Sequence, residues 1–370
     1  MNPFSNYDYA YIEFYVGMAK MVAYWHVKAL GFELAGYCGP ETGCNDKVSY
    51  LMEKNGVVLV ITSASTPANY EVLSFVDRHG NGVKRIAYQV NNVEQAFEHA
   101  LQNGGIPLTE PRQENDAHGS VSEAAIKLFD STELVFFDNS SYHGLFRPGF
   151  SNLEIMGFTP EFDNGFVAID HIAYGLRKNQ MDYWCGYFQK IFGGQLLQHL
   201  KPGHIITRYS GMLLKLLGSD NQKVFNVFVE PDNRQRSSQV EDYINAYYGS
   251  GIQHMAFSTA NIFETIDAMR KGGVDFVRFP QTYYDQMHKN AEIPKDIIEQ
   301  CETHHVLCDV QDNAFLFQTF TKPFGDRPTF FYEVIQRTNG YQGFALDNIL
   351  ELFKSVEAEQ KRRDLAAGDT

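Results

Sequence analysis

The sequence predicts an α+β protein of two tandem open β-barrel domains built from βαβββ modules, with a gating helix at the C-terminal end. Three observations support this fold. The chain has 370 residues, which is enough to bury two cores. Its segments follow the order strand, helix, strand pair, strand, helix, strand, and sheets interrupted by helices in this way are typical of such modules. The same order recurs in the second half of the chain.

The repeat can be followed residue by residue. Residues 80–90 (GNGVKRIAYQV) align with residues 249–259 (GSGIQHMAFST). Upstream, residues 11–15 resemble residues 171–175, and an amphipathic helix with a Tyr-Trp pair follows each of these strands. The halves are therefore copies of one architecture. The two predicted domains are residues 1–150 and residues 165–370.

The last helix-like segment carries an apolar stripe. Asn348 can cap a helix in which Ile349, Leu352, Phe353 and Val356 fall at positions i, i+3, i+4 and i+7. Such a stripe must lie on another apolar surface. It packs either on the barrel wall or as a lid over the barrel mouth, and we predict a lid helix at about residues 347–360.

Composition and charge exclude several classes of partner. The formal net charge is −14, whereas nucleic acid and anionic membranes bind a basic face. No apolar run reaches the about 18 residues of a membrane helix, and the first residues lack the basic and apolar regions of a secretory signal. Five Cys without framework spacing fit reduced thiols. We therefore expect a cytoplasmic protein without a nucleic-acid or membrane partner.

Three polar side chains interrupt strands that are otherwise apolar. Glu333 lies in the middle of the strand that ends at Arg337, and His171 and His254 each lie alone in an apolar strand. A buried ionised Glu is costly unless something positive holds it. Two imidazoles and one carboxylate from three strands form the facial triad of non-haem Fe(II) oxygenases. Alternatively, each could be an ordinary hydrogen-bonded or ion-paired core residue, since their spacing matches no local zinc motif.

Comparison of the two halves favours the metal. Where the second half has His171 and His254, the first half has Tyr11 and Arg85. Neither Tyr nor Arg is a ligand in an ordinary ferrous site. The asymmetry predicts one working site in the second half and one retired copy in the first.

A second cluster, Cys301-x-x-His304-His305-x-x-Cys308, resembles a zinc clip. It follows an acidic, helix-like stretch, and the segment after it turns into a strand. We interpret it as a loop that carries thiols, and expect no zinc there.

The chain resembles the 4-hydroxyphenylpyruvate dioxygenase and 4-hydroxymandelate synthase family of the vicinal-oxygen-chelate superfamily, from Tyr11 to about Glu359. The resemblance is carried by six motifs: Asp170-His171, Ser238-Gln239, Gly251-x-Gln253-His254, Pro280-x-x-Tyr283-Tyr284, Gln318-x-Phe320-Thr-Lys-Pro323 and Asp326-Arg-Pro-Thr-Phe-Phe-Tyr-Glu333-x-Ile-Gln-Arg337.

The resemblance implies roles for individual residues. His171, His254 and Glu333 would bind Fe(II). The pocket glutamines would be Gln239, Gln253 and Gln318. The aromatic residues that sandwich the substrate ring would be Phe320 and Phe344, and the polar residue that opens the gating helix would be Asn348. The substrates would be an aryl keto acid and O₂, without 2-oxoglutarate. We expect a homo-oligomer, a dimer or a tetramer, in which the first barrel contributes to assembly.

Two positions bear on the product. The dioxygenase, which gives homogentisate in tyrosine catabolism, has Asn where this chain has Val229, and Phe where it has Ile349. Both residues resemble the mandelate synthase, so we predict oxygen insertion at the benzylic carbon to give 4-hydroxymandelate. Homogentisate formation, or another aryl or aliphatic keto acid, is the alternative. An extradiol or glyoxalase-like enzyme and a non-enzymatic small-molecule binding module are more remote alternatives.

Overall fold

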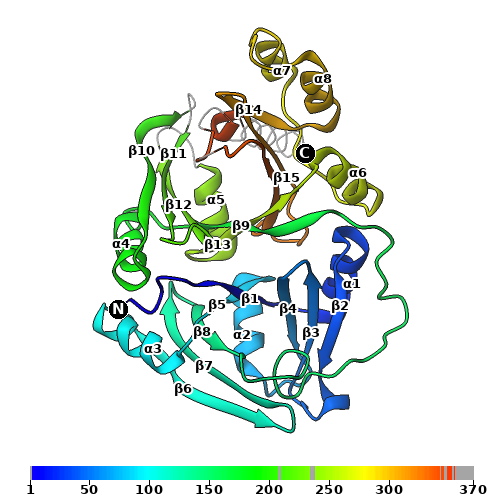
Figure 1. The fold of residues 1–370 in the computed structure, drawn as a ribbon, viewed down its shortest axis with the longest axis vertical. Coiled ribbons are helices and arrows are strands. Elements are labelled where there is room, and N and C mark those ends of the chain that lie inside the picture. The colour runs from blue at the N-terminus through cyan, green and yellow to red at the C-terminus, as the bar shows by residue number, and fades with distance from the viewer. Residues whose placement is uncertain are drawn as a thin grey trace, which may run out of the picture.

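A computed structural model describes residues 2–206, 210–233, 238–341, 343–345, 348–351 and 354. The chain forms two curled eight-stranded sheets, one from each half, with helices packed around them and with α2 (Tyr70–His79) and α5 (Gln239–Tyr247) between the arms of the sheets (Figure 1). Within these residues, no helix has the length and apolar character needed to cross a membrane.

The first sheet has the strand order β2-β3-β4-β1-β5-β8-β7-β6. Its strands are β1 (Asp8–Tyr15), β2 (Glu33–Cys38), β3 (Lys47–Lys54), β4 (Val57–Ala64), β5 (Gly82–Gln89), β6 (Pro107–Asp116), β7 (Gly119–Leu128) and β8 (Thr132–Asp138). The helices of this half are α1 (Ala19–Leu30), the short 3₁₀ helix η1 (Pro40–Thr42), α2 (Tyr70–His79) and α3 (Val93–Gln102).

The second sheet repeats this order as β10-β11-β12-β9-β13-β16-β15-β14. Its strands are β9 (Phe166–Gly175), β10 (Gln195–Ile206), β11 (Ser210–Gly218), β12 (Phe225–Asn233), β13 (Gly251–Thr259), β14 (Leu307–Gln311), β15 (Ala314–Phe320) and β16 (Phe331–Arg337). Its helices are α4 (Met181–Phe192), α5 (Gln239–Tyr247), α6 (Ile262–Lys271), α7 (Gln281–Met287) and α8 (Lys295–His304). The predicted α+β fold of tandem βαβββ modules is confirmed.

At the predicted site, equivalent residues of the two sheets pair in the same register. Tyr11 pairs with Ala87 in the first sheet, and His171 pairs with Ala256 in the second. On the other side of these alanines lie Val135 and Glu333. The first half therefore has a Tyr and a Val where the second half has two of the three predicted ligands.

Apolar side chains fill this region of the first half. The Tyr11 ring packs edge-on against Phe137 and Phe146, each with 5.2 Å between ring centroids. Arg85, which corresponds to His254, instead forms ion pairs with Glu13 at 2.9 Å and Glu133 at 2.7 Å. In the first half, packed rings and ion pairs therefore occupy the positions that correspond to His171 and His254.

The first half also holds the segment that leads into β16. The Trp25 ring stacks on Phe324 at 4.9 Å. Arg327 donates hydrogen bonds to the carbonyls of Asp77 and Arg78 at the end of α2, at 2.9 and 2.8 Å. Contacts between the halves thus fix residues 324–332, which end directly before Glu333.

His26 makes a buried polar contact across the same interface. Burial lowers the pKa of His26 to about 4, so its ring is neutral near pH 7. Its Nδ1 lies 2.7 Å from the Val22 carbonyl, which can only accept, so Nε2 is the acceptor for the Tyr332 hydroxyl, also at 2.7 Å. The hydrogen bond links α1 to the strand that carries Glu333.

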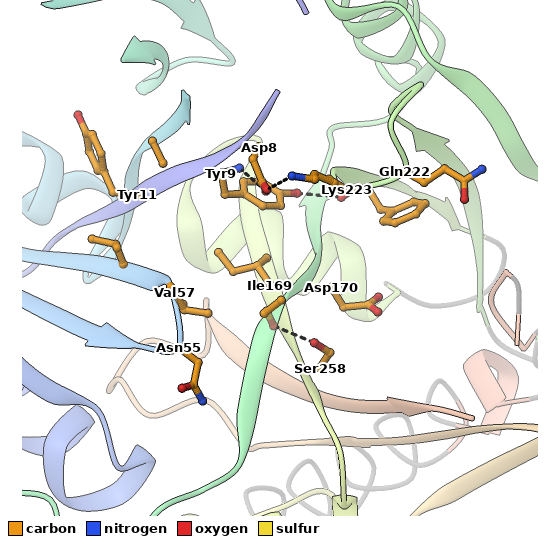
Figure 2. Close-up of a pocket in the computed structure, with 15 residues that line it drawn as sticks. Asp8, Tyr9, Tyr11, Asn55, Val57, Ile169, Asp170, Gln222, Lys223 and Ser258 are labelled. Atoms are coloured by element: carbon orange, nitrogen blue, oxygen red, sulfur yellow. Dashed lines mark hydrogen bonds and ion pairs between the residues drawn. The ribbon is translucent and has the colours of Figure 1, made fainter. Parts of the chain in front are cut away.

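A cavity of about 450 Å³ lies where β1 of the first half faces β9 and β12 of the second (Figure 2). Lys223 donates to Asp8 at 3.1 Å beside it, and the Tyr9 hydroxyl donates to the Phe225 carbonyl at 3.1 Å. Asp170 lines the same cavity. The halves therefore meet here through polar contacts around an open space.

The lid helix predicted for about residues 347–360 lies largely outside the described residues. Residues 348–351 and 354 are described and are helical. Ile349 donates its backbone N–H to the carbonyl of Ala345 at 3.2 Å, which begins this helical segment.

We expect Tyr332→Phe to destabilise the fold. The substitution leaves the buried Nε2 of His26 without its donor, and an unsatisfied buried group of this kind costs about 1–3 kcal/mol in the free energy of unfolding. Urea denaturation followed by circular dichroism measures the change.

Tyr284→Phe is the matched control. Tyr284 is also buried, but its hydroxyl has no hydrogen-bond partner among the described residues. Equal effects of the two substitutions would show that the His26 hydrogen bond contributes nothing to stability.

Candidate metal centre and its pocket

Three adjacent strands bring the predicted ligands together. In the order β9-β13-β16, Ala256 of β13 pairs with His171 on one side and with Glu333 on the other. His254 lies two residues before Ala256 and therefore on the same face of the strand. His171 Nε2 lies 3.1 Å and His254 Nε2 3.5 Å from one oxygen of Glu333, Oε2. One ligand atom from each of the three residues lies within 4.8 Å of the others.

A β-bulge adds a fourth pocket residue from β13. The pairing of β13 with β9 skips between Ile252 and His254, so Gln253 is the extra residue. Consecutive residues of a regular strand face opposite ways, but a bulge changes the direction of a side chain. Gln253 and His254 consequently both line the same pocket.

The site combines a buried carboxylate with two buried imidazoles. Exposed fractions of His171 and Glu333 are 1% and 2%. Burial raises the pKa of Glu333, but the two imidazoles outweigh it and hold this pKa at about 2. Burial lowers the pKa of His171, but the charge of Glu333 outweighs it and raises this pKa to about 9. Burial lowers the pKa of His254. An anionic oxygen with two nitrogens aimed at it fits a divalent first-row metal.

Further side chains orient the ligands. Asp170 lies 2.9 Å from Nδ1 of His171 and forms an ion pair with Arg337 at 3.0 Å. Burial raises the pKa of Asp170, but His171 and Arg337 hold it well below its ordinary range. The Gln318 amide donates to the other oxygen of Glu333, Oε1, at 2.9 Å. Such partners fix the rings and carboxylates of metal sites.

Asn348 connects this shell to the C-terminal segment. Its amide donates to the Gln318 carbonyl oxygen at 3.0 Å, and it accepts from the Tyr283 hydroxyl at 3.1 Å. Tyr283 in turn contacts the backbone of Cys308. Sequence reasoning placed Tyr283 in a family motif without a role and did not find the partners of Asp170. In the sequence, the only indication of these contacts is that Asp170 directly precedes His171.

The remaining predicted residues surround one pocket of about 400 Å³ that contains the triad. It is lined by Val229, Gln239, Gln253, Gln318, Phe320, Phe344 and Ile349. The Phe344 ring packs edge-on against His171, with 4.7 Å between centroids. Asn348 lies behind Gln318 rather than in the lining. The roles of these residues toward a substrate stay predictions.

The Cys301-x-x-His304-His305-x-x-Cys308 cluster was predicted to be a loop, and that prediction is wrong: Cys301 and His304 lie in α8, and Cys308 lies in β14. Nδ1 of His304 lies 2.8 Å from the Gln300 carbonyl oxygen. Among the described residues, the triad is the single group of three or more His, Cys, Asp or Glu side chains that could hold an ion.

Known proteins resemble this chain over almost its whole length. It is 34% identical to 4-hydroxyphenylpyruvate dioxygenase of Yarrowia lipolytica, with 96% of this chain and 92% of the relative covered. Identity to 4-hydroxyphenylpyruvate dioxygenase of Dictyostelium discoideum is 32%, with 95% and 98% covered. The chain belongs to the 4-hydroxyphenylpyruvate dioxygenase family.

Two further comparisons agree with this family. A profile of the Glyoxalase/Bleomycin resistance protein/Dioxygenase superfamily matches residues 168–316. The solved structure of a triple mutant of 4-hydroxymandelate synthase from Streptomyces coelicolor superposes with a TM-score of 0.85 at 27% identity, covering 97% of this chain and 100% of that chain. The family resemblance seen in the sequence is confirmed. The two names correspond to different reactions, and the comparisons do not separate them.

We expect Glu333→Gln to weaken metal binding by more than about 100-fold, because even the hydrogen-bond partners of metal ligands contribute about 10- to 100-fold. The change removes the negative charge but keeps the side-chain shape. Anaerobic titration calorimetry with Fe(II) measures the affinity, and O₂ uptake should be lost in parallel.

Glu230→Gln is the control, since Glu230 is also buried but accepts from the backbone N–H groups of Gln180 and Met181. Wild-type Fe(II) affinity in Glu333→Gln would remove Glu333 from the ligand set.

Proposed function

We propose that this protein is an Fe(II)-dependent dioxygenase that converts 4-hydroxyphenylpyruvate and O₂ to 4-hydroxymandelate and CO₂. The observation that carries the proposal is the buried triad of His171, His254 and Glu333 at the end of a pocket with an apolar wall. We further propose that it acts in the cytoplasm as a homo-oligomer. Residues 1–150 would form a domain without a metal site, and residues 165–370 the catalytic domain.

The overall reaction is balanced without a further reductant. The bond between the carboxylate and the keto carbon breaks and CO₂ leaves. One oxygen atom enters the new carboxylate and the other enters the benzylic C–H bond, so O₂ is reduced while the keto acid is oxidised. Fe(II) held by the triad would supply a chelation site for the keto acid and the activation of O₂.

The side chains around the triad would bind and orient the substrate. Phe344, which packs on His171, and Phe320 would contact the ring. Gln239 and Gln253 provide amides that donate and accept without adding charge near the metal. The segment at Asn348, held to Gln318, would exclude water from the pocket.

Ile349 and Val229 support benzylic oxidation. Both line the pocket with the triad, and both are largely buried. A Phe at position 349 would press the ring toward the metal. Ile is smaller and leaves space for the ring to tilt, which brings the benzylic carbon closer. The second candidate reaction is homogentisate formation, because relatives that are 30–34% identical carry the dioxygenase name.

The retained triad argues against the remote alternatives of a small-molecule binding module and an extradiol or glyoxalase-like enzyme. A binding module would not need metal ligands, and the family assignment separates the chain from the extradiol and glyoxalase enzymes. Iron analysis of the purified protein and an assay with catechols test these alternatives.

The identity of the product tests the proposed reaction. The protein is loaded with Fe(II) without oxygen, mixed with 4-hydroxyphenylpyruvate and exposed to O₂, and the products are separated by chromatography. We expect 4-hydroxymandelate. Homogentisate would show ring attack instead. If neither product forms, the natural substrate must be sought among other keto acids.

We expect Ile349→Phe to shift the product ratio toward homogentisate by roughly tenfold. A small change in how a side chain fits the substrate is worth about 1–3 kcal/mol. Chromatography of both products measures the ratio. Leu350→Phe is the control, because Leu350 is adjacent in the same helical segment but does not line the pocket. An unchanged ratio in Ile349→Phe would show that this position does not determine the product.

A further inference from the structure

We propose that Tyr283 is a positioning residue for Glu333, the carboxylate of the candidate metal centre. It acts through Asn348 and Gln318, which connect its hydroxyl to the carboxylate by a chain of hydrogen bonds that we call the relay. The direction of the relay presents a donor to Oε1 of Glu333. The inference rests on the metal site of the proposed function, and it is independent of the keto acid and of the product.

Three hydrogen bonds form the relay. The Tyr283 hydroxyl donates to Oδ1 of Asn348 at 3.1 Å. The Asn348 amide donates to Oε1 of Gln318 at 3.0 Å, and the Gln318 amide donates to Oε1 of Glu333 at 2.9 Å. Exposed fractions of the four side chains do not exceed 9%. Water therefore competes little for these bonds.

An edge strand anchors the far end of the relay. β14 lies at the edge of the second sheet, and the backbone N–H of Cys308 in this strand donates to the Tyr283 oxygen at 2.8 Å. A backbone N–H can only donate, so this bond occupies a lone pair of the hydroxyl and leaves its proton for another acceptor. Burial raises the pKa of Tyr283 well above its usual value, so the hydroxyl keeps that proton.

Two acceptors lie within reach of this proton. They are Oδ1 of Asn348 and the Cys308 carbonyl oxygen, each 3.1 Å from the Tyr283 oxygen. If the proton pointed to Cys308, the Asn348 amide would turn its nitrogen toward Tyr283, because two lone pairs would otherwise face each other. Its oxygen would then face Gln318. The Gln318 amide would turn as well and direct its oxygen at Glu333.

The carboxylate selects between the two directions. An amide oxygen aimed at a buried carboxylate oxygen repels it and leaves it without a donor, which is costly where water cannot replace the bond. Only the direction from Tyr283 to Asn348 supplies Oε1 of Glu333 with an N–H group. The other oxygen, Oε2, is the one that the two imidazoles face. The relay therefore separates the tasks of the two oxygens.

Tyr283 keeps the relay in this direction. Asn348 and Gln318 each end in an amide, which exchanges its donor and its acceptor when it turns over. The Tyr283 hydroxyl places a donor at Oδ1 of Asn348 and so fixes the orientation of the first amide, and the first amide fixes the second. Hydrogen bonds in such a chain strengthen one another. Removal of the hydroxyl takes a donor from Oδ1 and lets both amides turn.

The neighbouring Tyr284 is a matched control. It follows Tyr283 in α7 and is also buried, but its hydroxyl has no hydrogen-bond partner among the described residues. Tyr284→Phe therefore removes the same atom from the same helix without touching the relay. A general effect of losing a buried hydroxyl from α7 would be the same in both variants.

The experiment measures Fe(II) affinity by titration calorimetry, without oxygen and without a keto acid. Direct partners of metal ligands contribute about 10- to 100-fold to metal affinity. Tyr283 acts through two further side chains, so we expect Tyr283→Phe to weaken Fe(II) binding by about tenfold, at the lower end of this range. Tyr284→Phe should bind Fe(II) as the wild-type protein does. Wild-type affinity in Tyr283→Phe would overturn the inference.

A double-mutant cycle separates positioning from a general loss of structure. Gln318→Met removes the last link of the relay and keeps a side chain of similar length. In that background, Tyr283→Phe should change Fe(II) affinity by less than about twofold, because its route to Glu333 is already interrupted. An equal loss in both backgrounds would overturn the inference and leave the metal site intact. Absence of Fe(II) binding in the wild-type protein would overturn the proposed function as well.

Asn348→Leu tests the same relay if Tyr283→Phe does not fold. Circular dichroism and urea denaturation show which variants fold. Asn348→Leu removes the middle link, so we expect Fe(II) binding to weaken by about tenfold with Gln318 present and by much less in the Gln318→Met background. Wild-type Fe(II) affinity in folded Asn348→Leu would overturn the inference.

Discussion

The buried carboxylate of Glu333 constrains the rest of the second half. Its two oxygens have different partners: Oε2 faces the imidazoles of His171 and His254, and Oε1 accepts from Gln318. Each partner is itself held, His171 by Asp170 and Gln318 by Asn348. Since a buried charge without partners is costly, the strands and the segment at Asn348 must keep these positions together. The same contacts that stabilise the anion orient the three side chains that could hold a metal ion.

The duplicated architecture shows what happens when this constraint is absent. At the positions of His171 and Glu333, the first half has Tyr11 and Val135, and apolar rings fill the space. A packed core needs no cation, so this half is free to serve another purpose. Its helices α1 and α2 contact residues 324–332 and thereby fix the approach to Glu333. In this way the first half supports the second half.

Local pattern was sufficient to predict the fold and the triad, because each depends on features that a single strand displays. His171, His254 and Glu333 stand out as polar residues in apolar strands, and the repeat identifies the residues that correspond to them. The contacts behind the triad could not be predicted in this way. Arg337 reaches Asp170 from a strand 167 residues away, and Tyr332 meets His26 across the interface between the halves. Neither pairing leaves a periodic signal, and the bulge at Gln253 depends on pairing with β9.

The pocket combines the triad with apolar side chains. Two neutral imidazoles and one carboxylate leave a divalent metal with one net positive charge, which the carboxylate of a keto acid can neutralise. Under the proposed function, affinity for the keto acid would therefore come mainly from the metal end. The apolar side chains Val229, Leu214 and Ile349, which line the same pocket, contribute fit and no charge, and differences in fit are small in free energy. Under the proposed function, these side chains would set the position of the ring and hence the product, while the metal end would hold the keto acid in place.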